Sequence, residues 1–143
     1  MVNFAFGIIL LMVQLSAVVD GRLPDVLSAD YSSDSLVAGQ TGEVVVSLNV
    51  MDGYKINHTP PMTLKLEAIP GLSLAETSIV SPALDPDSTD VYYVDVPDFK
   101  VGVSATRAGG YEVPGELIYF FCSTADGFCA RHTLDVMVPV IAE

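Results

Sequence analysis

The sequence predicts an all-β protein built as an antiparallel sandwich, and three observations lead to that prediction. Apolar residues alternate with polar ones along several short runs that are rich in β-branched and aromatic side chains, which is the pattern of half-buried strands. Pro- and Gly-containing pairs separate these runs and mark turns. Beyond the N-terminal segment, no run shows a sustained 3.6-residue apolar repeat, so helices are not expected.

Composition limits the domain count and the classes of partner. A chain of 143 residues is expected to form a single domain. Half of the residues are hydrophobic and 17% are charged, which excludes a disordered tail. Six Lys and Arg residues stand against 18 Asp and Glu residues, for a net charge of −12. This balance argues against binding to nucleic acid or to an anionic membrane surface, because both need a concentrated positive patch.

The N-terminus has the features of an export signal. Residues 2–19 carry no charged side chain, and small residues and a first acid, Asp20, follow the apolar stretch. We therefore assign residues 1–21 to a secretory signal peptide and residues 22–143 to the exported domain. A retained anchor is the alternative, because the segment lacks basic residues at its start and about 18 apolar residues can just span a membrane. Either reading places the domain outside the cytoplasm, periplasmic or secreted, and it contacts a membrane only if the segment is retained.

The strands follow in order along the exported chain. The first run, residues 44–50, places Val44, Val46, Leu48 and Val50 on one face. The next, residues 62–68, alternates apolar positions with Thr, Lys and Glu in the same way. Four further runs share this character: residues 91–96, 99–103, 116–122 and 133–140. Short strands with turns at this spacing favour an immunoglobulin-like antiparallel sandwich.

The two cysteines define a hairpin. Cys122 ends one strand and Cys129 begins the next, and the six residues between them include the turn pair Asp126-Gly127. If the cysteines oppose each other, counting outward pairs Phe121 with Ala130, Phe120 with Arg131, Tyr119 with His132 and Leu117 with Leu134.

This register separates the two faces of the hairpin. The core face then carries Leu117, Tyr119, Phe121, Ala130, Leu134, Val136 and Val138. The cysteines fall on the other face, together with Ile118, Phe120, Arg131, Thr133 and Asp135. In an oxidising compartment a Cys pair is expected to form a disulfide. The loop it closes is short, so the chain-entropy model gives it only about 2.5 kcal/mol of stabilisation, and its position on the outer face favours access.

The cysteine hairpin resembles the N-terminal periplasmic domain of the DsbD thiol:disulfide interchange proteins. That family has a Gly-aromatic-Cys motif at the second cysteine, as Gly127-Phe128-Cys129 has here, and an early turn like Asp52-Gly53-Tyr54. Best-known members have five residues between the cysteines, one fewer than this chain. The resemblance implies an immunoglobulin-like fold and a Cys pair that takes electrons from a thioredoxin-like protein and passes them to oxidised exported proteins. It also implies an aromatic cap loop, for which Tyr92, Tyr93 and Phe99 are the candidates.

Two functional hypotheses remain open from the sequence. The first is an oxidoreductase-type thiol–disulfide interchange module in which Cys122 and Cys129 are catalytic; Arg131 would favour a thiolate there and Asp126 would oppose it. The second is a non-catalytic immunoglobulin-like binding or accessory domain whose disulfide only holds the hairpin together.

The sequence predicts no cofactor and no metal. Cys129, His132 and Met137 have the spacing of a copper-ligand loop, but residues five apart on one strand face opposite sides and cannot converge. We instead expect His132 to be partly buried against Tyr119, and Met137 to lie on the outer face.

Overall fold

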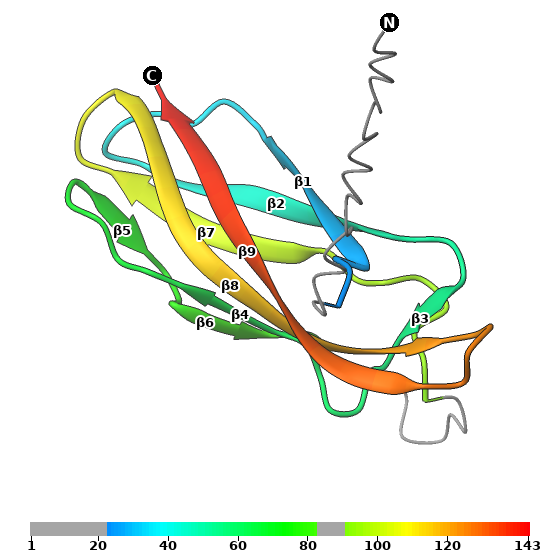
Figure 1. Ribbon diagram of the computed structural model, residues 1–143. Helices are drawn as coiled ribbons and strands as arrows, with labels where there is room; N and C mark the ends of the chain where they lie inside the picture. Colours follow the sequence, from blue (N-terminus) through cyan, green and yellow to red (C-terminus); the bar gives the residue numbers. More distant parts are fainter. Residues whose placement is uncertain (1–22, 83–90) are drawn as a thin grey trace, which may run out of the picture.

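The computed structural model describes residues 23–82 and 91–143, and these form nine strands in two antiparallel sheets (Figure 1). The strands are β1 (Leu27–Ser33), β2 (Thr41–Val50), β3 (Tyr54–Ile56), β4 (Thr63–Leu66), β5 (Leu72–Leu74), β6 (Ser78–Val80), β7 (Phe99–Ala105), β8 (Gly109–Ser123) and β9 (Cys129–Ala142). The predicted β-sandwich is confirmed. The predicted signal peptide, residues 1–21, lies outside the described residues.

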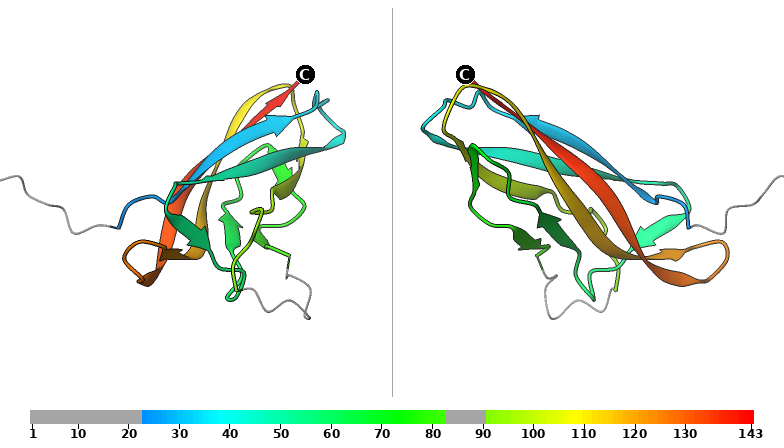
Figure 2. Two further views of the ribbon diagram at one scale, coloured as in Figure 1. Left: turned by 90° about the vertical axis from the view of Figure 1, so that its right-hand side faces the viewer. Right: turned by 60° about the vertical axis from the view of Figure 1, so that its left-hand side comes forward.

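Each sheet contributes one face to a shared core. The first sheet has the order β1-β2-β7-β5. In the second, β8 is central: β9 pairs along one side of it, and β3 and β4 pair with successive parts of its other side. Burial follows the predicted alternation most clearly in β7 and in the second half of β9, where inward residues are buried and their neighbours are not. In β2, Val44 and Val46 are buried, whereas Leu48 and Val50 are only partly buried. Two further views show the open, twisted arrangement of the layers (Figure 2).

The β8–β9 ribbon runs the length of the molecule and ends in the cysteine hairpin, at the far end from the C-terminus (Figure 1). Its register extends from the Gly109–Ala142 pair to the Cys122–Cys129 pair. Every predicted pairing across the hairpin is present, including Tyr119 with His132 and Phe120 with Arg131. A two-residue periodicity fixes this result, because a slip of one residue would expose the whole core face.

One predicted strand is wrong. Residues 91–96 alternate in sequence, but only Tyr92 forms a bridge, to Asn57. Around that bridge, the His58 N–H donates to the Val91 carbonyl at 3.0 Å and the Tyr93 N–H to the Ile56 carbonyl at 2.9 Å. The Tyr93 hydroxyl donates to the Pro82 carbonyl at 2.9 Å and lies 2.8 Å from Ser81 Oγ. These contacts bury Tyr93 and turn Val94 outward, where it is 88% exposed. The segment therefore packs as a loop against β3 and does not continue into a sheet.

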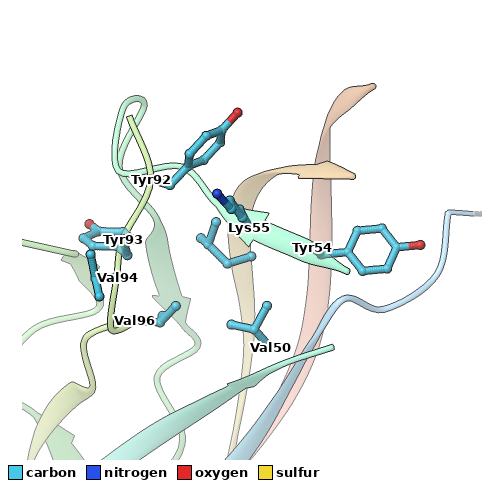
Figure 3. A pocket seen from close by; sticks show the side chains of 8 residues that line it. Val50, Tyr54, Lys55, Tyr92, Tyr93, Val94 and Val96 are labelled. Atoms are coloured by element: carbon cyan, nitrogen blue, oxygen red, sulfur yellow. The ribbon is translucent and has the colours of Figure 1, made fainter. Parts of the chain in front are cut away.

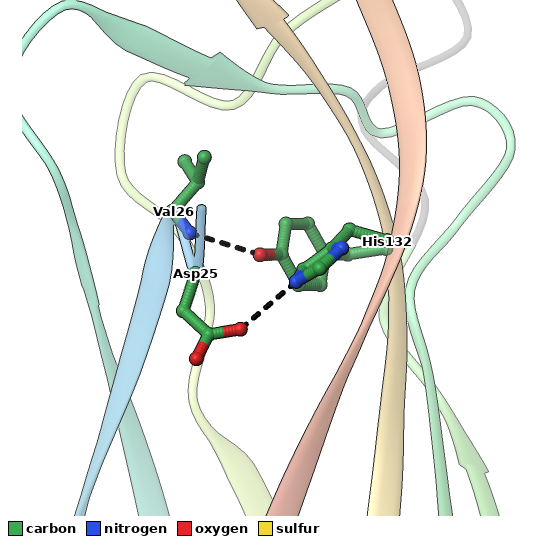
Figure 4. A network of polar contacts seen from close by, with 4 residues as sticks. Asp25, Val26 and His132 are labelled. Atoms are coloured by element: carbon green, nitrogen blue, oxygen red, sulfur yellow. Dashed lines mark hydrogen bonds and ion pairs between the residues drawn. The ribbon is translucent and has the colours of Figure 1, made fainter. Parts of the chain in front are cut away.

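The start of the described chain is tied to the ribbon by two polar contacts (Figure 4). The Val26 N–H donates to the hydroxyl oxygen of Tyr119 at 3.1 Å, and Asp25 Oδ1 lies 2.8 Å from His132 Nε2. Tyr119 is fully buried, and its burial raises the pKa of its hydroxyl. His132 packs edge-on against Tyr119 as predicted, with ring centroids 5.7 Å apart. The contact with Asp25 was not predicted.

Candidate functional site at the cysteine hairpin

Cys122 and Cys129 form a disulfide between directly opposed residues of β8 and β9. The Ser123 N–H donates to the Phe128 carbonyl at 2.8 Å, so that neighbouring pair is a hydrogen-bonded one. Because the two kinds of pair alternate in an antiparallel ladder, the cysteines occupy a non-hydrogen-bonded pair, in which the backbones approach most closely. Their Cα atoms are 4.0 Å apart. The strand pairing itself thus places the two sulfur atoms within bonding reach.

The turn that joins the two cysteines is fixed by its own polar groups. The Asp126 N–H donates to Ser123 Oγ at 3.1 Å, and Gly127 has a positive φ of 71°, which glycine adopts without strain. The Thr124 N–H donates to the Gly53 carbonyl at 2.9 Å and anchors the turn to the loop before β3. The hairpin tip is therefore held in place by the disulfide, by its turn and by the neighbouring loop.

The two cysteines differ in exposure. Cys129 is exposed at the start of β9, whereas Cys122 is only 6% exposed. The expectation of an accessible pair is therefore correct for Cys129 and wrong for Cys122. β3 covers Cys122, because it pairs with β8 at this position, and Asn57 Oδ1 lies 3.5 Å from Cys122 Sγ. An incoming group thus has access to one cysteine and not to the other.

Two cations flank the disulfide on the outer face. Lys55 is paired directly with Cys122 across β3 and β8, so the outer face carries Lys55, Cys122 and Cys129 in one row. Arg131, the basic residue named in the sequence analysis, is exposed and lies two residues after Cys129 on the same face of β9. These are two of only six basic residues in the chain. Sequence reasoning missed Lys55, because its place depends on the register between β3 and β8.

A pocket of about 410 Å³ opens beside this row, between β3 and residues 92–96 (Figure 3). The Lys55 ammonium lies 5.3 Å from the ring centroid of Tyr92, close enough for a cation–π contact. Of the three aromatic residues proposed as a cap, only Tyr92 is placed here in contact with a residue of the disulfide row. Tyr93 is buried at the base of the same loop, and Phe99 belongs to the core face of β7.

The inner face beneath the disulfide is aromatic. Phe121 is fully buried and contacts Tyr54, Phe128 and His132, with ring centroids 5.6, 6.0 and 6.4 Å away. Edge-to-face contacts of this kind add to the stability gained by burial. The disulfide therefore lies over buried aromatic side chains, with the exposed cations Lys55 and Arg131 on its outer face.

The residues with copper-like spacing do not converge. His132 points inward to Asp25, while Met137 is 48% exposed on the outer face. Within residues 23–82 and 91–143, no three His, Cys, Asp or Glu side chains gather to hold a metal ion. In the same ranges no helix is long and apolar enough to cross a membrane. Comparison of the chain with protein-family models and with curated proteins finds no match.

Proposed function

We propose that this protein is an exported thiol–disulfide exchange module that works through Cys122 and Cys129. The observation that carries the proposal is the pairing of an exposed Cys129 with a shielded Cys122 at the tip of a hairpin that fourteen residue pairs already hold together. A bond closing so short a loop contributes about 2.5 kcal/mol at most in the chain-entropy model. The sequence resemblance to the DsbD N-terminal domain supports the same role.

The unequal exposure of the two cysteines supports one order of steps, in which the partner reacts first with Cys129. A thiolate of a dithiol partner attacks Cys129 Sγ, which forms an intermolecular disulfide and releases Cys122 as a thiolate. The second thiol of the partner then attacks the partner's first sulfur atom in the intermolecular disulfide, and Cys129 leaves as a thiolate. Two electrons pass from the partner to the Cys pair, and the partner becomes a disulfide. The reduced pair reverses these steps with an oxidised protein.

The surroundings favour this chemistry on electrostatic grounds. A cation near a sulfur atom stabilises the thiolate, which is both the attacking and the leaving species. Lys55 opposes Cys122, the leaving group, and Arg131 lies beside Cys129. The Asn57 atom near Cys122 Sγ is the acceptor Oδ1, which suits the protonated thiol of the reduced pair and not its thiolate. The partners we propose are a thioredoxin-like donor and oxidised exported proteins.

The reduction potential of the full chain tests the proposal. Equilibration in graded thiol buffers, with alkylation and mass spectrometry to count free thiols, is expected to give a value of roughly −200 to −270 mV. A disulfide that only holds the hairpin together should lie below about −300 mV. A pair that stays oxidised until the protein unfolds would contradict exchange.

The pocket between β3 and residues 92–96 favours a second candidate, a non-catalytic binding domain with a structural disulfide, because it offers a place for a ligand away from the sulfur atoms. The Cys122→Ala, Cys129→Ala double variant would then lose stability only.

A further inference from the structure

The edge of β9 differs sharply between its two halves. Its odd-numbered residues belong to non-hydrogen-bonded pairs with β8, as the Cys122–Cys129 pair does, so their N–H and C=O groups point away from the ribbon. These outward groups form the edge of the second sheet. An unpaired strand edge is a ready template for another extended segment.

The C-terminal half of this edge is covered. The Tyr31 hydroxyl of β1 bonds to the backbone of Met137, and Pro139 has no N–H to offer. Beyond it, the Glu143 N–H donates to the Leu36 carbonyl at 2.8 Å, and the Ala38 N–H donates to the Glu143 carbonyl at 2.9 Å. The outward positions at Met137 and Glu143 thus have neighbours, and Pro139 lacks a donor.

The half next to the disulfide is open. Among the described residues, no strand pairs with the outer edge at Cys129, Arg131 or Thr133. Cys129 and Arg131 are also exposed. The remaining strands at sheet edges near this end are shorter, since β3 and β6 have three residues each. Among the described residues of the second sheet, an uncovered backbone edge therefore begins at the accessible cysteine.

We propose that the β9 edge from Cys129 to Thr133 binds an extended, cysteine-bearing segment of the redox partner by antiparallel strand addition. The inference rests on the proposed exchange function and adds how a partner protein is recognised. A residue placed opposite Cys129 in the added strand joins it in a hydrogen-bonded pair, with Cα atoms about 5.5 Å apart. That separation lies within the range of about 4.4 to 6.8 Å that disulfides accept, and both side chains share the outer face.

Main-chain pairing suits this task because it recognises any extended segment, while the cysteine provides the chemistry. The Arg131 cation adds a preference for segments with an acidic residue near the cysteine.

The test compares Arg131→Pro with Arg131→Ala in the full chain. Both remove the cation, but only proline removes the outward N–H, and Pro139 occupies an equivalent position in the same strand. The probe is a capped five-residue peptide, TVTVC, whose first, third and fifth residues would lie opposite Thr133, Arg131 and Cys129, and glutathione is the small thiol that needs no strand pairing. We expect the peptide to open the disulfide about tenfold more slowly in Arg131→Pro than in Arg131→Ala, with equal glutathione rates.

Methylated peptides give a second measurement that does not depend on any variant. N-methyl groups on the first and third residues of this peptide block pairing with β9, whereas N-methyl groups on its second and fourth residues face away. The first peptide should react about tenfold more slowly than the second with the unmodified chain.

The outcomes separate the two proposals. If glutathione opens the disulfide but the two variants and the two methylated peptides react alike, strand addition is overturned and exchange stands. If no thiol opens the disulfide in the folded protein, exchange itself is overturned, and strand addition with it. If Arg131→Pro abolishes dimerisation of this chain but leaves the peptide rates unchanged, the edge serves self-association and the proposed occupant is wrong.

Discussion

The two halves of the β8–β9 ribbon follow the same alternating pattern but have different surroundings. The body half, from Gly109 to Leu117 and back along β9, packs its inner face on the opposite sheet and has its outer edge covered by β1 and by residues 36–38. The tip half, from Ile118 to Thr133, also buries its inner face, yet its edge is open and its outer face carries the disulfide. The same alternating sequence pattern thus forms a structural region in the body half and a candidate functional site in the tip half. The two halves differ in the segments that pack beside them.

The largest effect should come from the body half. Leu117 is 1% exposed, and Leu117→Ala removes a core side chain, which costs about 3 kcal/mol of unfolding free energy. Ile141→Ala is the matched control, because Ile141 lies on the same ribbon but is 68% exposed and should change stability by less than about 0.5 kcal/mol. Denaturant unfolding measures both. Equal losses would mean that the ribbon is not packed as described.

The next effect tests the tip. The Cys122→Ala, Cys129→Ala double variant should lose about 2.5 kcal/mol or less, because the bond closes a short loop within a ribbon that stays paired. It should retain a native near-UV spectrum and lose all thiol exchange with glutathione. A loss of folding would place the disulfide among the structural elements and remove the contrast between the halves.

A smaller effect concerns the contact between the chain start and the ribbon. Tyr119→Phe removes the oxygen that accepts the Val26 N–H and leaves a buried donor unpaired, at a cost of about 1 to 3 kcal/mol. Tyr111→Phe is the control, because the Tyr111 hydroxyl donates to the Arg107 carbonyl at an exposed site. Chemical unfolding of both variants measures the two losses of stability, and their difference gives the effect of burial.

The same tyrosine predicts how stability changes with pH. The pKa of Tyr119 is raised in the folded state, chiefly by burial, so the folded protein holds the proton more tightly than the unfolded chain. The stability that this gives is complete below the unfolded pKa of about 10 and declines as pH rises through the folded pKa. Denaturant unfolding at a series of pH values from 8 upward should show this loss of unfolding free energy. In Tyr119→Phe the unfolding free energy should fall less steeply with pH. Tyr31, whose pKa is also raised by burial, accounts for a further part of it.

The smallest effect tests the cations of the tip. Lys55→Gln should slow opening of the disulfide by glutathione about threefold, because an exposed cation stabilises a nearby thiolate by less than about 1 kcal/mol. Lys65→Gln is the control, since Lys65 lies opposite Glu116 and away from the disulfide. The difference should shrink as salt is added. Identical rates for the two variants would remove Lys55 from the site.

Sequence reasoning reached furthest where periodicity and a covalent constraint acted together. The opposed cysteines and the period of two fixed the register of β8 and β9, and the inward position of His132 followed from it. It failed where local pattern is weak. Leu27–Ser33 forms β1 although it is mostly polar, because its backbone pairs with β2.

The rest of the site depends on contacts between residues far apart in the chain. Lys55 reaches Cys122 only through the β3–β8 pairing, and Asp25 meets His132 across 107 residues. Residues 91–96 show the opposite error, because this strand-like sequence forms a single bridge, at Tyr92, beside the anchored Tyr93 side chain.

The open half of the β9 edge also bears on solubility. Exposed strand edges promote aggregation, and proteins often protect them with charge. Here the charged Arg131 belongs to the edge strand while the molecule as a whole carries a net charge of −12, so two copies repel each other before their edges can pair. That protection weakens as the carboxylates are neutralised. Acidification toward the isoelectric point of about 4.2 should therefore bring on edge-to-edge association, and purification and storage are best kept near neutral pH.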